Sequence, residues 1–298
     1  MDNELLLIDR LEVIRKTIAK YGEENFYISF SGGKDSTVLH YLVDMALPNN
    51  KIPRVFSNTG IEYQAIVKFV KELASKDERF EIIQPKVSIK KMLEEKGYPF
   101  KSKEHSLKVG EYQKGSRTKS VVGYKEKAND ENSRFSCPKS LLYQYEDDFK
   151  IKLSDKCCYE LKKIPFHQYE ITHNKRICIT GMQQAEGGQR ANMHNCITAR
   201  KGKIVKFHPL LKVDENWENW FIQKYNIKLC KLYYEPYNFK RTGCKGCPYS
   251  LDLQEQLETM EKYLPNERKQ CEFIWKPVYE EYRRLGYRLN KEEQLKLF

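Results

Sequence analysis

The chain has 298 residues, of which 40% are hydrophobic and 32% are charged. This length and composition exclude a wholly disordered chain and a small scaffold that needs disulfides or metals merely to fold. Lysine and arginine number 53 against 41 aspartates and glutamates, which gives a formal charge of +12. The excess favours a polyanionic partner or an anionic substrate, with a basic solvated surface as the alternative.

The nine cysteines are an odd number and cannot all be paired in intramolecular disulfides. The apolar run from Leu5 to Ile8 is too short for a signal peptide core, and no stretch approaches the roughly 20 apolar residues of a membrane span. We therefore expect a cytoplasmic protein with no membrane partner. In that compartment, clustered cysteines indicate a metal or catalytic site before they indicate disulfides.

Hydrophobic spacing predicts an amphipathic helix over 3–20, within an N-terminal segment 1–24. Strand, turn and helix patterns then recur at three places: 26–45, 54–73 and 80–96. Strands that alternate with helices imply right-handed crossovers, a mainly parallel sheet, and binding at the carboxyl ends of the strands. The predicted class is α/β, with a mainly parallel twisted sheet flanked by helices and a helical C-terminal part.

The segment from about 101 to 135 is polar and basic, with few large aliphatic residues. We expect either a mobile insertion, such as a lid, or a loosely ordered linker. If this segment binds a nucleic acid, the affinity will fall steeply with salt. Further elements are predicted along the rest of the chain: a helix over 141–161, strands over 176–181 and 203–207, and mostly helix from 217 onwards, with a loop near 237–250.

One hexapeptide between the first predicted strand and helix has the composition of a phosphate-binding loop: Ser31-Gly32-Gly33-Lys34-Asp35-Ser36. Its glycines let consecutive backbone N–H groups face one anion, the helix N-terminus adds its dipole, and Lys34 adds a compact positive charge. Because the glycines are adjacent and Asp35 follows the lysine, it is not a Walker A loop. A capped glycine turn is the structural alternative.

Four cysteines form a second candidate site, as the tandem pair Cys157-Cys158 and the Cys-x-x-Cys turn of Cys244 and Cys247. Adjacent thiolates do not readily reach one tetrahedral zinc, but they can reach separate irons of a cubane. Gly246 within the turn suits either metal. We favour a [4Fe-4S] cluster, with zinc or reduced structural cysteines as the alternatives.

These motifs resemble the PAPS reductase family, which is related to the PP-loop ATP pyrophosphatases of the adenine nucleotide alpha-hydrolase-like superfamily. Besides the loop, the likeness is carried by three segments: 55–62, 180–191 and 208–211. The first is similar to the family motif D-T-G-x-E, with Asn58 in place of the acid. The second resembles G-x-R-x-x-E/Q-S-x-x-R, with Gln183 and Gln184 where arginines are usual. A family domain is therefore expected over 25–250, followed by a helical extension over 251–298.

The resemblance implies that the loop holds the pyrophosphate of ATP while the α-phosphate is attacked. Lys34 would stabilise charge on the phosphates as a catalytic residue, and Asp35 would help to place Mg²⁺. The residues that the resemblance assigns to nucleotide binding are Ser31, Gly32, Gly33, Lys34, Asp35, Ser36, Asn58, Thr59, Gly60, Gly181 and Arg190.

The cysteine pattern is similar to the [4Fe-4S] pattern of assimilatory adenylylsulfate reductases. Its combination with this loop resembles the ATP pyrophosphatases of DNA phosphorothioation and, more loosely, tRNA thiolases. That likeness implies adenylation of an acceptor, such as a nucleic acid, followed by sulfur transfer. A cysteine desulfurase or another persulfide donor would supply the sulfur.

Two other functions stay open. A sulfonucleotide reductase would attack an adenylyl sulfate with a cysteine thiolate, release sulfite and need a thioredoxin-type reductant. Cys271 is the candidate nucleophile, because such reductases carry one in a C-terminal segment, although its neighbours over 267–284 predict helix packing. The third possibility is a nucleotide-binding subunit without turnover. The remaining cysteines are expected to be ordinary thiols: Cys137, Cys178, Cys196 and Cys230.

Overall fold

The computed structural model describes residues 2–130, 133 and 135–291. Parts of three predicted segments therefore lie outside the described residues: residue 1 of the N-terminal segment, residues 131, 132 and 134 of the basic insertion, and residues 292–298 of the extension. The described chain forms two compact units. The first comprises 2–58, 62–84 and 164–243, and the second comprises 59–61, 85–163 and 244–291.

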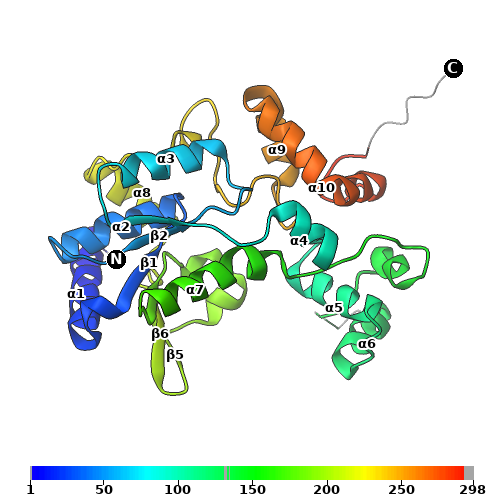
Figure 1. The fold of residues 1–298 in the computed structure, drawn as a ribbon, viewed down its shortest axis with the longest axis horizontal. Helices are drawn as coiled ribbons and strands as arrows, with labels where there is room; N and C mark the ends of the chain where they lie inside the picture. The colour runs from blue at the N-terminus through cyan, green and yellow to red at the C-terminus, as the bar shows by residue number, and fades with distance from the viewer. Residues whose placement is uncertain (1, 131–132, 134, 292–298) are drawn as a thin grey trace. The chain divides into compact units, whose positions relative to one another are not determined.

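A six-stranded sheet lies at the centre of the first unit, in the order β3-β2-β1-β4-β6-β5 (Figure 1). Its strands are β1 (Phe26–Ser29), β2 (Arg54–Ser57), β3 (Phe80–Ile83), β4 (Ile177–Ile179), β5 (Ile197–Arg200) and β6 (Lys203–Phe207). Neighbouring strands are parallel except for β5, which is antiparallel to β6 and lies outside the predicted strands. The predicted α/β class with a mainly parallel sheet is confirmed.

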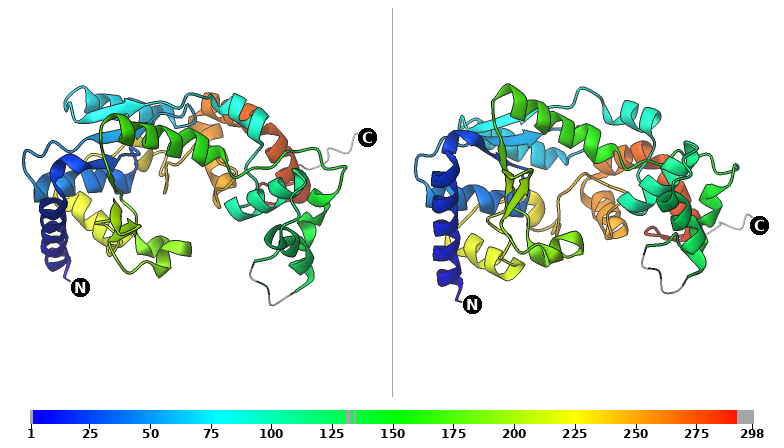
Figure 2. Two further views of the ribbon diagram at one scale, coloured as in Figure 1. Left: turned by 60° about the horizontal axis from the view of Figure 1, so that its bottom comes forward. Right: turned by 90° about the horizontal axis from the view of Figure 1, so that it is seen from below.

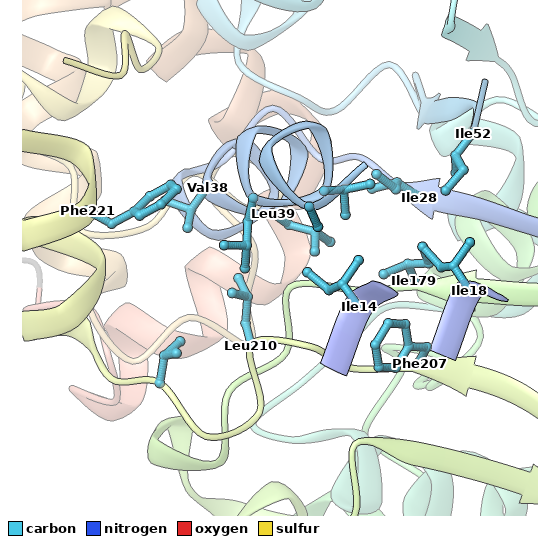
Figure 3. Packing of buried hydrophobic residues seen from close by; sticks show 14 of the residues in the cluster. Ile14, Ile18, Ile28, Val38, Leu39, Ile52, Ile179, Phe207, Leu210 and Phe221 are labelled. Carbon is cyan, nitrogen blue, oxygen red and sulfur yellow. The ribbon is translucent and has the colours of Figure 1, made fainter. Parts of the chain in front are cut away.

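Helices pack on both faces of this sheet because its strand residues are apolar on both faces. These helices are α1 (Asn3–Tyr21), α2 (Lys34–Ala46), α3 (Gln64–Ala74), α7 (Ile164–Thr172) and α8 (Glu215–Lys224). In β1, Ile28 joins the cluster formed with α1, α2 and α8, whereas its neighbour Tyr27 packs against Tyr169 of α7. Figure 3 shows Ile14 and Leu39 in the first cluster. Burial on both faces is typical of parallel sheets.

The order of the strands determines where the phosphate loop lies. From β1 the chain continues to β2 and β3 on one side, and later returns to β4 on the other side of β1. The carboxyl end of β1 is therefore a topological switch point, where open α/β sheets bind their ligands. The loop that follows β1 and the segment that follows β4 meet at this position.

The second unit is built largely from helices: α4 (Ile89–Lys96), α5 (Lys103–Gln113), α6 (Lys119–Glu126), α9 (Leu253–Tyr263) and α10 (Pro265–Leu285). Figure 2 shows α9 and α10, coloured orange to red, packed side by side. The expectation of a loosely ordered linker over 101–135 is wrong where α5 and α6 form. His105, Val109, Val121 and Tyr124 on these helices are buried and supply a core that the polar composition conceals.

The predicted helix over 141–161 is also wrong. A 3-10 helix, η3 (Lys139–Tyr145), and a π-helix, η4 (Tyr159–Lys163), stand at the two ends of this segment. Between them, Leu153 pairs with Tyr98 in an isolated parallel bridge. The chain there passes so close to Gly110 that a Cβ would overlap the Leu153 carbonyl oxygen. This tertiary packing requires extended backbone and overrides the local helical pattern.

Within residues 2–130, 133 and 135–291, no helix combines the length and the apolar character needed to cross a membrane.

Candidate functional site

The predicted phosphate loop closes on itself between β1 and α2. The Ser36 hydroxyl donates to the Gly33 carbonyl at 3.0 Å, and its oxygen accepts from the Ser31 N–H at 3.2 Å. Gly32 has a φ of +73°, and a Cβ there would lie 2.9 Å from Ile66 Cγ2. Only glycine therefore fits at this position without a shift of α3. The loop ends at Lys34, the first residue of α2.

A residue far along the chain completes the loop. The Lys34 backbone N–H donates to the Tyr233 hydroxyl at 2.9 Å, and this hydroxyl lies 2.7 Å from Thr242 Oγ1. The oxygen of Tyr233 thus occupies a position at the N-terminus of α2, where an anionic oxygen would bind. Because Tyr233 is 199 residues from Lys34, no local sequence pattern could reveal the contact.

The Lys34 side chain is ion-paired at the edge of the site. Its Nζ lies 2.7 Å from Glu215 Oε1, and the Lys34 side chain is 14% exposed against 72% for Glu215. The hydrogen bond and the charge of Lys34 lower the pKa of Glu215. Lys34 is therefore held by a solvent-exposed carboxylate that an incoming phosphate group could replace.

The segment after β4 packs against the loop. A Cβ at Gly181 would lie 2.9 Å from the Asp35 carbonyl oxygen, so the absence of a side chain lets the two backbones meet. Farther along this segment, Glu186 pairs with Arg190 and, at 3.0 Å, with Arg241. The structure thus brings Gly181 to the loop, while Arg190 is engaged with a carboxylate.

A carboxyl pair, Asp35 on α2 and Glu218 on α8, lies beside the loop. Burial raises the pKa of both groups, and a neighbouring carboxylate raises each further, Glu186 for Asp35 and Asp35 for Glu218. The charge of Lys34 acts in the opposite direction on both. The pKa of Glu218 reaches about 8. Sequence reasoning missed Glu218, because its chemistry depends on burial between helices and belongs to no motif.

The remaining residues expected at the nucleotide are divided between the units. Asn58 follows β2 in the first unit, and its N–H donates to the Ile83 carbonyl at 2.9 Å. Thr59 and Gly60 belong to the second unit, where Gly60 has a φ of +81°. A role for these three residues in nucleotide binding stays a prediction.

The four cysteines predicted as metal ligands all lie in the second unit. Cys157 and Cys158 directly precede η4, and in the turn the Cys247 N–H donates to the Cys244 carbonyl at 3.3 Å. Burial and the other cysteines raise the pKa of the Cys157 and Cys247 thiols, to about 12 for Cys247, while Lys162 lowers both. Cys157 therefore interacts electrostatically with Cys158, Cys244 and Cys247, and a role for the four as metal ligands stays a prediction.

The nine cysteines all lie in the described part of the chain, and none of them forms a disulfide there. In the part of the chain that the structure describes, no group of three or more histidine, cysteine, aspartate or glutamate side chains could hold a metal ion. Four thiolates on one zinc must each come within about 2.3 Å of it, whereas in a cubane each binds its own iron. The described structure therefore presents no ready-made zinc site at these four thiols.

Helix α10 holds the Cys-x-x-Cys turn through its backbone carbonyls. Trp275 Nε1 donates to the Lys245 carbonyl at 3.2 Å, the Tyr279 hydroxyl donates to the Gly246 carbonyl, and the Tyr282 hydroxyl donates to the Pro248 carbonyl at 2.9 Å. The three donor side chains are almost completely buried. These bonds fix the turn from a helix for which the sequence predicted no role beyond packing.

Cys271 lies on the same helix and packs against the turn. A Cβ at Gly246 would lie 2.8 Å from its Sγ, and the residue has 0% exposure. Burial raises the pKa of the thiol to about 12. The predicted helix over 267–284 is confirmed by α10, and a buried, protonated thiol on it is poorly suited to act as a nucleophile.

A family model for the phosphoadenosine phosphosulfate reductase domain matches residues 25–250. The chain belongs to this family. The matched PAPS reductase domain includes the whole sheet, the phosphate loop and the four clustered cysteines, whereas α9 and α10 lie beyond it.

Several solved structures are similar to this PAPS reductase-family chain at low identity. A PAPS reductase from Candida auris is 14% identical over 74% of this chain and 88% of its own, with a TM-score of 0.40. An FMN adenylyltransferase from Candida glabrata in complex with ATP is 13% identical over 78% and 58%, with a TM-score of 0.46. A U34-tRNA thiolase from Methanococcus maripaludis with its [4Fe-4S] cluster is 17% identical over 95% and 80%, with a TM-score of 0.41. No curated protein matches the sequence.

Proposed function

We propose that this PAPS reductase-family chain binds ATP at the loop after β1 and adenylates an acceptor oxygen for sulfur transfer. The closed loop supports the proposal most directly. It ends with Lys34 at the N-terminus of α2, with the Asp35 carboxyl alongside. A helix N-terminus, glycine backbone and a lysine together suit a polyphosphate.

The reaction follows from what these groups can stabilise. The acceptor oxygen attacks the α-phosphorus, the bond from that phosphorus to the bridging oxygen breaks, and pyrophosphate leaves with the electron pair. Lys34 Nζ and the loop N–H groups stabilise the charge that gathers on the leaving oxygens. To do so, Lys34 must break its ion pair with Glu215 and bind phosphate instead. The outer sulfur of a persulfide then displaces the adenylated oxygen, which leaves with AMP, and the acceptor carries a mixed disulfide. A second thiol attacks the donor's sulfur and cleaves this S–S bond, which leaves the thiolated acceptor and a new disulfide on the donor.

Asp35 would hold the Mg²⁺ that accompanies ATP. A half-buried carboxyl next to the loop is an oxygen ligand of the kind that Mg²⁺ prefers, and bound Mg²⁺ neutralises phosphate charge.

A [4Fe-4S] cluster bound by Cys157, Cys158, Cys244 and Cys247 is the second part of the proposal. The donor set supports it, because four neighbouring thiols oppose one another's ionisation until a cationic centre compensates the charge. The adjacency of Cys157 and Cys158 favours a cubane over zinc, because neighbouring thiolates do not readily reach one tetrahedral ion. Such a cluster supplies redox or sulfur chemistry when bound.

The acceptor is proposed to be a polyanion such as a nucleic acid. Exposed cations on and between α5 and α6 supply the charge for such a partner, namely Lys103, Lys114, Arg117 and Lys119. Arg117 also stacks over the Tyr112 ring, 3.6 Å from its centroid.

Release of pyrophosphate from ATP and Mg²⁺ tests the proposal. We expect Lys34→Ala to lower the rate about 100-fold or more, as for other groups that stabilise transition-state charge. Lys16→Ala, at a side chain that is exposed on α1, is the matched control and should leave the rate unchanged. Unchanged pyrophosphate release by Lys34→Ala would refute the role of the loop.

Sulfonucleotide reduction is the second candidate, and the family match favours it. The burial of Cys271 argues against it, because that thiol has 0% exposure. Sulfite from an adenylyl sulfate with thioredoxin, and no pyrophosphate from ATP, would reverse the order of the two. Tight nucleotide binding with neither product would identify a nucleotide-binding subunit.

A further inference from the structure

Glu218 is a buried carboxyl for which the proposed reaction has so far given no role. It lies on α8, which packs against α2, and is 1% exposed. Within the described residues, its Oε1 atom has no hydrogen-bond partner. Burying a carboxylate oxygen without a hydrogen-bond partner costs free energy. A ligand that binds this oxygen offsets that cost, which favours binding.

The cations around the pair are engaged with other carboxylates. Lys34 is paired with Glu215, and Arg241 is paired with Glu186 at 3.0 Å. Arg190 is also paired with Glu186. Glu218 is buried and Asp35 is half-buried beside the phosphate loop, and neither is ion-paired with any of these three cations. Two adjacent carboxyls, one of them fully buried, are favoured by a proton or a cation between them, because the charges of two carboxylates repel each other.

We propose that Glu218 is a second protein ligand, with Asp35, for the divalent cation that accompanies the nucleotide. Mg²⁺ in phosphate-handling sites is commonly held by one or two carboxylates together with substrate phosphates and water. One oxygen from each of these side chains, next to a loop suited to polyphosphate, supplies that arrangement. The inference rests on the proposed nucleotide site but not on the chemistry that follows binding.

Mn²⁺ with α,β-methylene ATP, which cannot release pyrophosphate, is the probe. Loss of the electron paramagnetic resonance signal of free Mn²⁺ measures how much metal the protein–nucleotide complex holds. We expect Glu218→Gln to weaken Mn²⁺ binding about tenfold or more, and Asp35→Asn to do the same, because each removes one charged ligand. Affinity for the metal-free nucleotide should not fall in Glu218→Gln, since the amide fills the same space.

Glu267→Gln is the matched control, because Glu267 is also a buried carboxyl on a helix but lies in the second unit. It should bind Mn²⁺ as the unsubstituted protein does. Unchanged Mn²⁺ affinity in a folded Glu218→Gln protein would overturn the inference, as would an equal loss of metal-free nucleotide binding, which indicates packing alone. Metal binding that depends on Glu218 without pyrophosphate release from ATP would support this site and refute the proposed reaction.

Discussion

The phosphate loop and the cysteine turn are two glycine turns, one in each unit, that are held in opposite ways. Each has a glycine with positive φ, Gly32 at +73° and Gly246 at +59°, and each contacts a tyrosine hydroxyl from a distant part of the chain. At the loop, Tyr233 accepts from the Lys34 N–H. At the turn, Tyr279 donates to the Gly246 carbonyl.

This difference in polarity explains what each turn can bind. A backbone that keeps an N–H directed toward an oxygen is suited to an anion. At the cysteine turn, the backbone carbonyls accept hydrogen bonds from a helix. The groups left to bind a ligand are therefore side chains, the thiols of Cys244 and Cys247. Substitutions that alter the supporting contacts should therefore affect the two turns differently.

The largest effect is expected at Gly246, where the backbone is left-handed and α10 lies in contact. In Gly246→Ala, the new Cβ would overlap the Tyr279 hydroxyl and lie 2.8 Å from Cys271 Sγ. Left-handed strain and overpacking together should lower the free energy of unfolding by about 3 kcal/mol or more. Denaturant unfolding measures the change, together with iron content after anaerobic reconstitution.

Gly243→Ala is the matched control, three positions earlier, because a Cβ there would meet nothing within 4 Å. Its free energy of unfolding should stay close to that of the unsubstituted protein. Equal effects of the two substitutions would mean that α10 does not constrain the turn.

A smaller effect is expected when only one supporting hydrogen bond is removed. Tyr279→Phe keeps the buried ring but leaves the Gly246 carbonyl without this donor. The cost in unfolding free energy should be about 1–2 kcal/mol. Tyr159→Phe, at a half-exposed ring next to Cys158, is the control and should cost little. A Tyr279→Phe protein as stable as this control would show that the hydrogen bond contributes nothing.

The turn between β1 and α2 was predictable because its information is local. The glycines, the cap and the lysine are consecutive, and they lie between the predicted strand and helix that became β1 and α2. Alternating burial of Tyr27 and Ile28 similarly follows from the strand period. Fold class therefore follows from patterns of a few residues.

Contacts between distant residues were not predictable. The bonds from α10 to the turn join residues 30 to 34 positions apart, and the pairing of Leu153 with Tyr98 replaced a predicted helix. In the sequence, Glu218 is an acidic residue between Trp217 and Trp220 that belongs to no motif. Only its burial beside Asp35 gives it a chemical role. Such features depend on which surfaces meet, which periodicity does not specify.

The smallest effect is expected at Glu215, and it concerns the loop alone. Glu215→Gln removes the carboxylate that holds Lys34. The lysine then no longer has to break an ion pair before it binds phosphate. Because Glu215 is 72% exposed, solvent screens the pair and it contributes at most about 1 kcal/mol. Nucleotide affinity, measured by calorimetry at low salt, should therefore rise by no more than about fivefold.

Glu12→Gln removes an exposed carboxylate from α1 and should leave the affinity unchanged. Weaker nucleotide binding in Glu215→Gln would mean that Glu215 orients Lys34 toward the phosphates and does not compete with them.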